Sequence, residues 1–460
     1  MTLLQDMIIQ GAERFPDREA VADPKNSRSY AQLAEASRRI AIWLRRTGVR
    51  PGDRVVLMLP NGVDFIAAHF GVLMAGGISV PCEANASAAT IAAIRDSCAP
   101  RASLDAVTII EALATRDGTL PDAERTTDDL ATLMYTTGST GRPKGVMLTH
   151  GNTLAAIQNI IGFVGYTAQD REVVILPLSH SFGLGHVYCN LSCGGAVYTE
   201  PGLTRVGRVL RKVADWGATG FPGTPLGYAM LMDRYGEIFQ ERCRNLRFIV
   251  VNSAPLPPSE AARLRAMLPD VNLMVYYGLT EASRSTFISL SQCGLAYYGS
   301  VGQAMPGIDL RLSDENEVLI AGPTVAQGYW NDPEQTAAAF HDGYLHSGDQ
   351  GRIDEDGFLH VTGRFKDLIN VGGYKVYPAE IEKVLLEHDA VEDACAFGTD
   401  RVEAAIVTRR DVSEIELSRF CYQRLEGFKV PSRIYPVAFI QRSETGKIIR
   451  HAVAAQCRGT

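Results

Sequence analysis

Short apolar runs alternate with segments of helical periodicity along the first part of the chain. The runs VVLMLP at 55–60, EVVILPL at 172–178, RFIVVNSA at 247–254 and LMVYYG at 273–278 have the length and composition of buried strands. The stretch PSEAARLRAML at 258–268 instead repeats apolar residues at helical spacing. Buried strands separated by helices predict an α/β fold with mainly parallel sheets.

The pattern changes in the second part of the chain. From Gly299 to Val361, short alternating strands and turns predict a small β-rich region. From about Lys366, a helical segment (PAEIEKVLLEH), a strand-like run (AAIVTRR), another helix and a polar tail predict a small α+β domain. We therefore predict a large N-terminal domain over 1–365, made of parallel-sheet α/β subdomains plus the β-rich region, and a C-terminal domain over 366–460.

The composition is that of a globular protein and argues against nucleic acid as a partner. The 460 residues are 46% hydrophobic and 21% charged, as expected for a chain that buries hydrophobic cores, and the net charge of −7 makes a nucleic-acid partner unfavourable.

The sequence predicts neither a signal peptide nor a membrane span. The N-terminal MTLLQDMIIQGAERF has Asp6 inside its apolar part, so we expect a surface helix rather than a signal peptide. The run at 66–80 is too short and too polar for a membrane span. Nine scattered cysteines without a CxxC pair favour reduced thiols in the cytoplasm, and the oligomeric state stays open.

One loop has the composition of a phosphate cradle. The segment YTTGSTGRPKGVMLTH at 135–150 combines glycines, hydroxyl side chains and Lys144. A Walker loop requires GxxxxGK followed at once by Ser or Thr, whereas here Pro143 precedes Lys144 and Gly145 follows it. A P-loop phosphotransferase is therefore disfavoured.

The same loop resembles the signature of the adenylate-forming enzymes, which include acyl-CoA synthetases, aryl-CoA ligases, luciferases and the adenylation domains of peptide synthetases. Further blocks that resemble this family follow in the family's order: the stretch at 56–81, LPLSHSFGLG at 176–185, YGLTEAS at 277–283, the stretch at 343–382 and ETGKIIR at 444–450. The resemblance spans essentially the whole chain. It implies ATP-dependent activation of a carboxylic acid to an acyl-adenylate with release of pyrophosphate. The acyl group then passes to the pantetheine thiol of coenzyme A (CoA) or of an acyl carrier protein.

The resemblance also implies roles for individual residues. ATP would be bound by Thr136, Thr137, Gly138, Ser139, Thr140, Gly141, Lys144, Ser253, Ala254, Pro255, Tyr277, Gly278, Asp349 and Arg364. The catalytic residues would be His180, Thr280, Glu281 and Lys447, with Glu281 also holding Mg²⁺ through hard oxygen ligation. Lys366 would be the hinge of a mobile C-terminal domain, whose movement brings Gly372 and Gly373 toward a thiol tunnel.

The substrate block favours an acid without an α-amino group. Relatives that activate amino acids carry an Asp in this block to pair with the ammonium, and LPLSHSFGLG has none. An aryl or acyl acid would lie against His180, Phe182, Phe221, Gly223, Val301 and Gly302. Arg284 could meet a second anionic group or form a structural ion pair.

Two alternatives remain within the family. One is an adenylation domain that loads only a carrier protein, since the C-terminal segment lacks the strong basicity that would indicate the phosphates of CoA. The other is a catalytically inactive ligand-binding relative, which the presence of Lys144, Glu281, Asp349 and Lys447 argues against.

Overall fold

The computed structural model describes residues 2–116, 118–121, 123–137, 143–372, 374–443 and 446–459. The chain forms two compact units. Unit 1 comprises Met1–Asn252, Leu256–Leu310 and Ile320–His346, and unit 2 comprises Ser253–Pro255, Arg311–Leu319 and Ser347–Thr460. Each unit is described by itself below.

The first sheet of unit 1 is mostly parallel, as the strand–helix alternation predicts. Its order is β5-β3-β4-β6-β7, with β3 (Arg54–Leu57), β4 (Ile78–Pro81), β5 (Ala102–Leu104), β6 (Leu130–Thr137) and β7 (Pro143–Thr149). Only β6 and β7 pair antiparallel, as a hairpin. Helix α3 (Val63–Met74) packs against β3 and β4, and α2 (Tyr30–Arg46) covers α3. Because α3 is enclosed in this way, every residue from Val63 to Leu73 except Asp64 is buried.

Two four-stranded sheets form the middle of unit 1. One has the order β2-β1-β9-β8 and the other β10-β11-β12-β13. Their strands are β1 (Glu19–Ala22), β2 (Ser27–Ser29), β8 (Arg171–Val174), β9 (Ala196–Thr199), β10 (Phe248–Val251), β11 (Asn272–Tyr277), β12 (Thr286–Ser289) and β13 (Gln303–Ala304). Gly220 bridges Glu172 of β8 and Phe248 of β10, and Gly223 bridges Val251. The segment from Gly220 to Gly223 therefore joins the two sheets.

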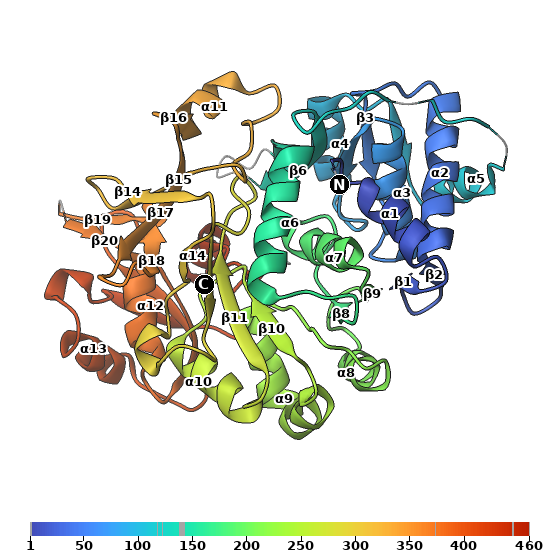
Figure 1. The fold of residues 1–460 in the computed structure, drawn as a ribbon. Helices are drawn as coiled ribbons and strands as arrows, with labels where there is room; N and C mark the ends of the chain where they lie inside the picture. Colours follow the sequence, from blue (N-terminus) through green and yellow to red (C-terminus); the bar gives the residue numbers. More distant parts are fainter. Residues whose placement is uncertain are drawn as a thin grey trace. The chain divides into compact units, whose positions relative to one another are not determined.

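Helices flank these sheets. Helices α6 (His150–Val164) and α7 (Ser181–Cys193) pack against each other (Figure 1), and α7 also packs against β8 and β9. The other helical segments of unit 1 are α1 (Asp6–Arg14), α4 (Ala88–Cys98), α5 (Thr108–Ala114), α8 (Val206–Asp215), α9 (Pro225–Cys243), α10 (Pro258–Met267), α11 (Pro333–Ala339) and the 3₁₀ turn η1 (Leu295–Tyr297). The surface helix expected at the N-terminus and the helix expected at 258–268 are thus confirmed as α1 and α10.

The predicted β-rich region is confirmed as a sheet of short strands. Its order is β14-β15-β17-β16, and β18 also pairs with β17. The strands are β14 (Asp309–Leu312), β15 (Glu317–Ala321), β16 (Phe340–His341), β17 (Tyr344–Ile353) and β18 (Leu359–Arg364). The division between the two units falls within β14, β15 and β17.

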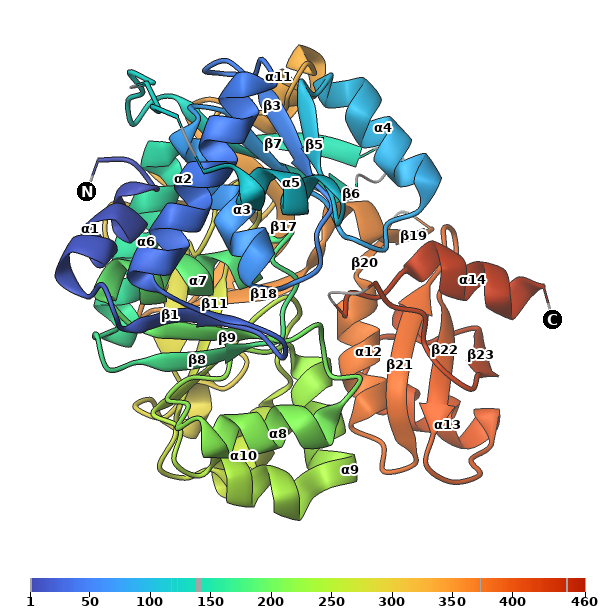
Figure 2. The same ribbon diagram turned by 90° about the vertical axis from the view of Figure 1, so that its right-hand side faces the viewer.

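A three-stranded sheet is the centre of unit 2. Strands β21 (Val391–Phe397), β22 (Glu403–Thr408) and β23 (Arg433–Pro436) lie side by side in that order (Figure 2). Alternate side chains of β21 pack into two different hydrophobic cores, because successive side chains of a strand point to opposite faces of the sheet. Ala394 and Ala396 share a core with α12 (Pro378–Leu386) and α13 (Glu414–Tyr422), whereas Cys395 and Phe397 pack with Val453 and Cys457 of α14 (Arg450–Arg458). The final segment is thus not only the polar tail that we expected. Its two buried residues, four apart, fix it as a helix on the sheet.

The remaining elements of unit 2 are short. They are the 3₁₀ turns η2 (Phe365–Asp367) and η3 (Gly427–Lys429) and the paired strands β19 (Ile369–Val371) and β20 (Tyr374–Val376).

The α/β class with a large N-terminal and a small C-terminal part is confirmed. The domain boundary at 365/366 stays a prediction, as does any movement of the C-terminal domain. All nine cysteines lie within the described ranges as free thiols, seven of them buried. Within those ranges, no helix combines the length and apolar character needed to cross a membrane.

Candidate active site

The predicted phosphate loop connects β6 and β7. Thr136 and Lys144 are cross-strand partners at the end of this hairpin, followed by Thr137 and Pro143. The strand pairing therefore brings the lysine beside the first hydroxyl residue of the motif. The side chain of Thr137 lies outside the described part of the structure, as do Gly138, Ser139, Thr140 and Gly141. Their contacts with phosphate stay predictions.

Tyr329 contacts two motif residues, Lys144 and Glu281, that lie more than a hundred positions apart in the sequence. The Trp330 N–H donates to the Gly145 carbonyl (2.8 Å), which places the neighbouring Tyr329 ring below Lys144, with Nζ 5.2 Å from the ring centroid. The Tyr329 hydroxyl donates to Glu281 Oε1 at 2.9 Å. Lys144 and Glu281 thus contact the same aromatic side chain.

Sequence reasoning missed Tyr329. Its only signal is an aromatic pair, Tyr329-Trp330, after a glycine. Burial raises the pKa of the Tyr329 phenol well above its usual range, and the Glu281 carboxylate adds to this effect. The hydroxyl therefore stays a hydrogen-bond donor at any physiological pH. The Glu281 carboxylate offers the hard oxygen that Mg²⁺ prefers, so the residue fits its predicted role.

A tight loop carries Tyr277, Gly278 and Thr280. The Ser285 N–H donates to the Tyr277 carbonyl (2.9 Å) and the Leu279 N–H donates to the Ala282 carbonyl (3.0 Å). A side chain at Gly278 would collide with the backbone at Ala282 and Arg284, so this close approach requires glycine. Tyr277 is buried at the end of β11 and Thr280 is half-buried beside Glu281. Adenine stacking by Tyr277 stays a prediction.

The first turn of α7 presents the predicted acid-binding residues. His180 is the N-cap residue of α7, and its Nε2 lies 2.8 Å from Glu83 Oε1. The Phe182 ring packs edge-on against Tyr276 of β11, with the ring centroids 5.5 Å apart. Sequence reasoning missed Glu83, which no motif singled out.

The other predicted pocket residues lie on or beside strands β10 to β13. Phe221 and Gly223 belong to the segment that joins the two sheets, and Phe221 is buried. The Val301 carbonyl accepts from Thr286 Oγ1 at 2.5 Å. Gly302 has φ +101° and approaches Phe287 too closely for any side chain. A role for these residues in binding the acid stays a prediction.

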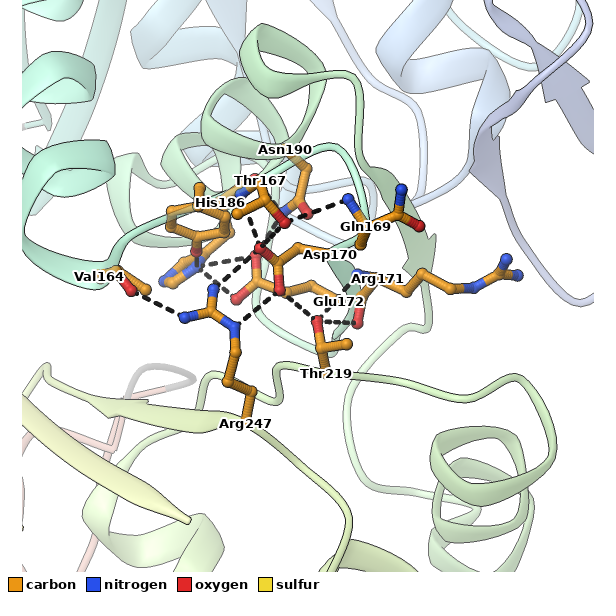
Figure 3. Close-up of polar contacts among 11 residues, drawn as sticks. Val164, Thr167, Gln169, Asp170, Arg171, Glu172, His186, Asn190, Thr219 and Arg247 are labelled. Carbon is orange, nitrogen blue, oxygen red and sulfur yellow. Dashed lines mark hydrogen bonds and ion pairs between the residues drawn. The ribbon is translucent and has the colours of Figure 1, made fainter.

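Buried charged residues on and beside β8 hold α7 in place (Figure 3). Glu172 of β8 is fully buried, and its carboxylate lies 3.0 Å from His186 Nδ1 and accepts from Asn190 Nδ2 at 2.5 Å. Next to Glu172 along the chain, Asp170 pairs with Arg247, whose Nη2 lies 2.9 Å from Oδ2. Because His186 and Asn190 belong to α7, this network fixes the helix whose N-terminus carries His180.

Unit 2 contains the predicted ribose-binding pair. Asp349 of β17 and Arg364 of β18 are cross-strand partners, with Nε 2.6 Å from Oδ1. The Asp349 carboxylate is buried, so the guanidinium orients it before any ligand binds. Ser253, Ala254 and Pro255 follow β10 along the chain, and Ser253 has φ +84°.

The predicted catalytic lysine lies on a tight turn of unit 2. The Ser443 N–H donates to the Lys447 carbonyl (2.8 Å), and the Lys447 N–H donates to Ser443 Oγ (3.2 Å). Arg442 donates to the Gly446 carbonyl at 3.0 Å and pairs with Asp393 at 2.7 Å. The Lys447 side chain is exposed.

The predicted hinge and thiol-tunnel residues lie on neighbouring segments of unit 2. Lys366 is exposed in η2, and the next residue, Asp367, pairs with Arg450, whose Nε is 3.2 Å from Oδ2. Gly372 has φ +59° in the turn between β19 and β20. Gly373 lies outside the described residues. The roles of these residues stay predictions.

Comparison with known proteins agrees with this geometry. The family described as "AMP-binding enzyme" matches residues 9–330, and "AMP-binding enzyme C-terminal domain" matches residues 380–447. The chain is 31% identical to an oxalate–CoA ligase of Arabidopsis thaliana over 98% of both chains, and 31% identical to a feruloyl-CoA synthase of Amycolatopsis over 97% of both. Its fold is similar to that of O-succinylbenzoate coenzyme A synthetase from Bacillus subtilis in complex with ATP and magnesium ion, with a TM-score of 0.87, 26% identity and coverage of 97% of this chain and 99% of that chain.

The chain therefore belongs to the AMP-binding enzyme family, within the adenylate-forming superfamily. The resemblance seen in the motifs is confirmed.

Proposed function

We propose that the protein is an AMP-forming acid–thiol ligase that activates an aryl or acyl carboxylic acid with ATP and transfers it to CoA. The observation that carries this proposal is the contact of both Lys144 and Glu281 with Tyr329. A cation and a hard-oxygen carboxylate on one aromatic side chain suit a magnesium–polyphosphate group.

The first half-reaction joins two anions. A carboxylate oxygen of the acid attacks the α-phosphorus of ATP, the bond to the bridging oxygen breaks, and pyrophosphate leaves with its electron pair. Lys144 attracts the phosphates, Thr280 donates to the α-phosphate, and Mg²⁺, when bound, neutralises phosphate charge beside Glu281. The Lys447 ammonium lowers the barrier by bridging carboxylate and phosphate as their charges meet.

The second half-reaction releases AMP. The thiol sulfur attacks the acyl carbonyl carbon after losing its proton, and the bond from that carbon to the AMP oxygen breaks. Rotation of the C-terminal domain at Lys366 would separate the two steps and bring Gly372 and Gly373 toward the thiol.

The relatives support the choice of acid and acceptor. Proteins named as oxalate–CoA ligase, feruloyl-CoA synthase and 2-succinylbenzoate–CoA ligase are 30–31% identical to this chain. None of these acids carries an α-amino group, which agrees with the absence of an Asp from LPLSHSFGLG. All three names give CoA as the acceptor.

Pyrophosphate exchange across a panel of acids tests the proposal. One or more aryl or aliphatic acids should give Mg²⁺-dependent exchange and release AMP, and α-amino acids should be poor substrates. Mass detection of the thioester on CoA, and in parallel on a holo-carrier protein, then identifies the acceptor. Steady release of ADP would contradict the proposal, and the absence of exchange with every acid would favour the inactive relative.

Two variants test the roles of Lys447 and Lys366. Lys447→Ala should slow pyrophosphate release about 10²–10³-fold, since one preorganised donor is lost. It should transfer ready-made acyl-adenylate to the thiol at close to the wild-type rate. Lys366→Pro should do the opposite, because proline fixes φ and resists the rotation. If each folded variant lost the rates of adenylation and of thioester formation to the same extent, this result would contradict a rotation between the two steps.

A further inference from the structure

The first turn of α7 contacts a buried cationic side chain, that of Arg284. The Arg284 side chain is buried, with 3% of its surface exposed. Nη1 donates to the Ser181 carbonyl at 2.8 Å and to Ser283 Oγ at 2.6 Å, and Nη2 donates to the Phe182 carbonyl at 3.0 Å. Its Cζ lies 5.3 Å from the centroid of the Tyr276 ring. The guanidinium is therefore held beside Phe182, a residue expected to line the acid's binding site.

Glycine makes room for this side chain. A Cβ at Gly185, one turn into α7, would overlap the Arg284 guanidinium. Arg284 also has φ +56°, a backbone conformation that long side chains rarely adopt. The absence of a side chain at Gly185 and the strained backbone of Arg284 together allow the guanidinium to occupy this position. Such strain persists where the surrounding structure enforces it, and it is concentrated at functional sites.

The charge of Arg284 has no carboxylate partner among the described residues. An arginine remains protonated in proteins, and a buried charge without a counterion is unfavourable. Among the residues that the structure describes, no Asp or Glu oxygen lies within 4.0 Å of the guanidinium, and its bonds go to carbonyl, hydroxyl and aromatic groups. A guanidinium carries five N–H donors, and these bonds use both on Nη1 and one on Nη2. The edge formed by Nε and Nη2 is the one that a carboxylate would engage with two parallel hydrogen bonds.

We infer that Arg284 selects an acid that carries a second carboxylate. One carboxylate is activated at the α-phosphorus and the other pairs with the Nε and Nη2 edge of Arg284. The bonds to Ser181, Phe182 and Ser283 fix the guanidinium in advance, so little ordering is required when the acid binds. This inference rests on the proposed function and adds a substrate class, a dicarboxylic acid, to it.

Pairs of acids matched in length test the inference. Succinate is compared with butanoate and with monomethyl succinate, and glutarate with pentanoate, in the pyrophosphate-release assay. We expect kcat/KM of the wild type to favour a diacid over the matched monoacid by about 10²-fold or more, since a buried charge would otherwise remain unpaired. In Arg284→Met this ratio should fall to near one, mainly through a higher KM for the diacid. The Tm of the variant without acid, compared with that of the wild type, shows whether it folds.

Two further variants complete the design. Arg284→Lys keeps the charge and should retain part of the diacid preference. Arg263→Met removes the exposed arginine that pairs with Asp233, at 2.5 Å, and should leave the ratio unchanged. A wild type that prefers monoacids, or an unchanged ratio in Arg284→Met, would overturn the inference while leaving the ligase proposal intact.

Binding measured without turnover separates the two proposals. Thermal unfolding is followed with each acid for the wild type and Arg284→Met. If no acid releases pyrophosphate, the proposed function fails. The assignment of Arg284 to a carboxylate then still holds if a diacid, and not its monoacid, raises the Tm of the wild type alone, and it fails if the diacid does not.

Discussion

The hydroxyl group of Tyr329 should matter for the use of magnesium and ATP. Tyr329→Phe removes the donor 2.9 Å from Glu281 Oε1 and keeps the ring that lies 5.2 Å from Lys144 Nζ. A hydrogen bond to a charged group is worth about 1.5–3 kcal/mol, and each 1.4 kcal/mol corresponds to a factor of ten. We therefore expect kcat/KM for ATP to fall about 10- to 10²-fold.

The assay is pyrophosphate release at varied ATP and Mg²⁺. If the hydroxyl orients Glu281, the concentration of Mg²⁺ that gives half-maximal rate should rise, and excess Mg²⁺ should restore part of the lost activity. Tyr344→Phe is a matched control. It also removes a hydroxyl bonded to a carboxylate, at 2.6 Å from Asp309 Oδ2, but this pair is exposed. Its kinetics should match the wild type.

Two results would refute this reasoning. If Tyr329→Phe retains the wild-type dependence on Mg²⁺ and ATP, the hydrogen bond does not orient Glu281. If Tyr344→Phe loses activity to the same extent, the effect is not specific to the candidate site. Both variants should unfold at close to the wild-type temperature.

Three further predictions concern the surrounding structure. Glu172→Ala breaks the buried pair with His186 and should lower the free energy of unfolding by about 3–5 kcal/mol in a denaturant titration. Burial lowers the pKa of His69 to about 3, so between pH 6.5 and 3 the unfolded chain binds a proton that the native protein does not. This group should therefore lower stability by about 1.4 kcal/mol per pH unit as the pH falls, and His69→Gln should reduce the slope of stability with pH, measured by thermal unfolding between pH 6 and 4, by that amount, leaving the share of His150, whose pKa is lowered by burial to about 4. Arg450→Met removes the ion pairs with Asp367 and Glu382 that hold the first residue of α14, three positions after Lys447, and should slow pyrophosphate release about 10- to 10²-fold. An unchanged rate with faster proteolysis would limit Arg450 to a structural role.

The fold class and the order of the site motifs could be predicted because both depend on local pattern. Buried strands are mostly apolar, and the strands predicted at 55–60 and 273–278 are observed as β3 and β11. The prediction of a polar tail was only partly right. Only two of the nine residues of α14, Val453 and Cys457, are buried, which is too few to mark a helix without the sheet beneath them.

The side-chain contacts could not be predicted, because they depend on how distant segments pair. Tyr329 reaches Glu281 only because its segment pairs with β7, and a shift of one residue would turn the ring to the other face. Glu83 and His180 meet in the same way across separate elements. Buried charges are rare enough that sequence alone gives no reason to place Glu172 in the core, and only the structure shows His186 and Asn190 beside it.

Positive φ outside glycine occurs in two of the motif loops, at Ser253 and Arg284, and also outside the motifs, for example at Ala99 and Glu124. Three of the residues with positive φ outside glycine are Asn316, Asn331 and Asp342, types that tolerate this conformation. Ser253 and Arg284 do not belong to those types, and each follows a strand that leads into a predicted binding segment. Strain of this kind costs about 1–3 kcal/mol per residue, which Gly at either position would relieve. At position 284, however, glycine would remove the guanidinium together with the strain. An arginine at this position is therefore unfavourable for stability alone, and its presence is understandable if the side chain binds something that the folded chain does not itself supply.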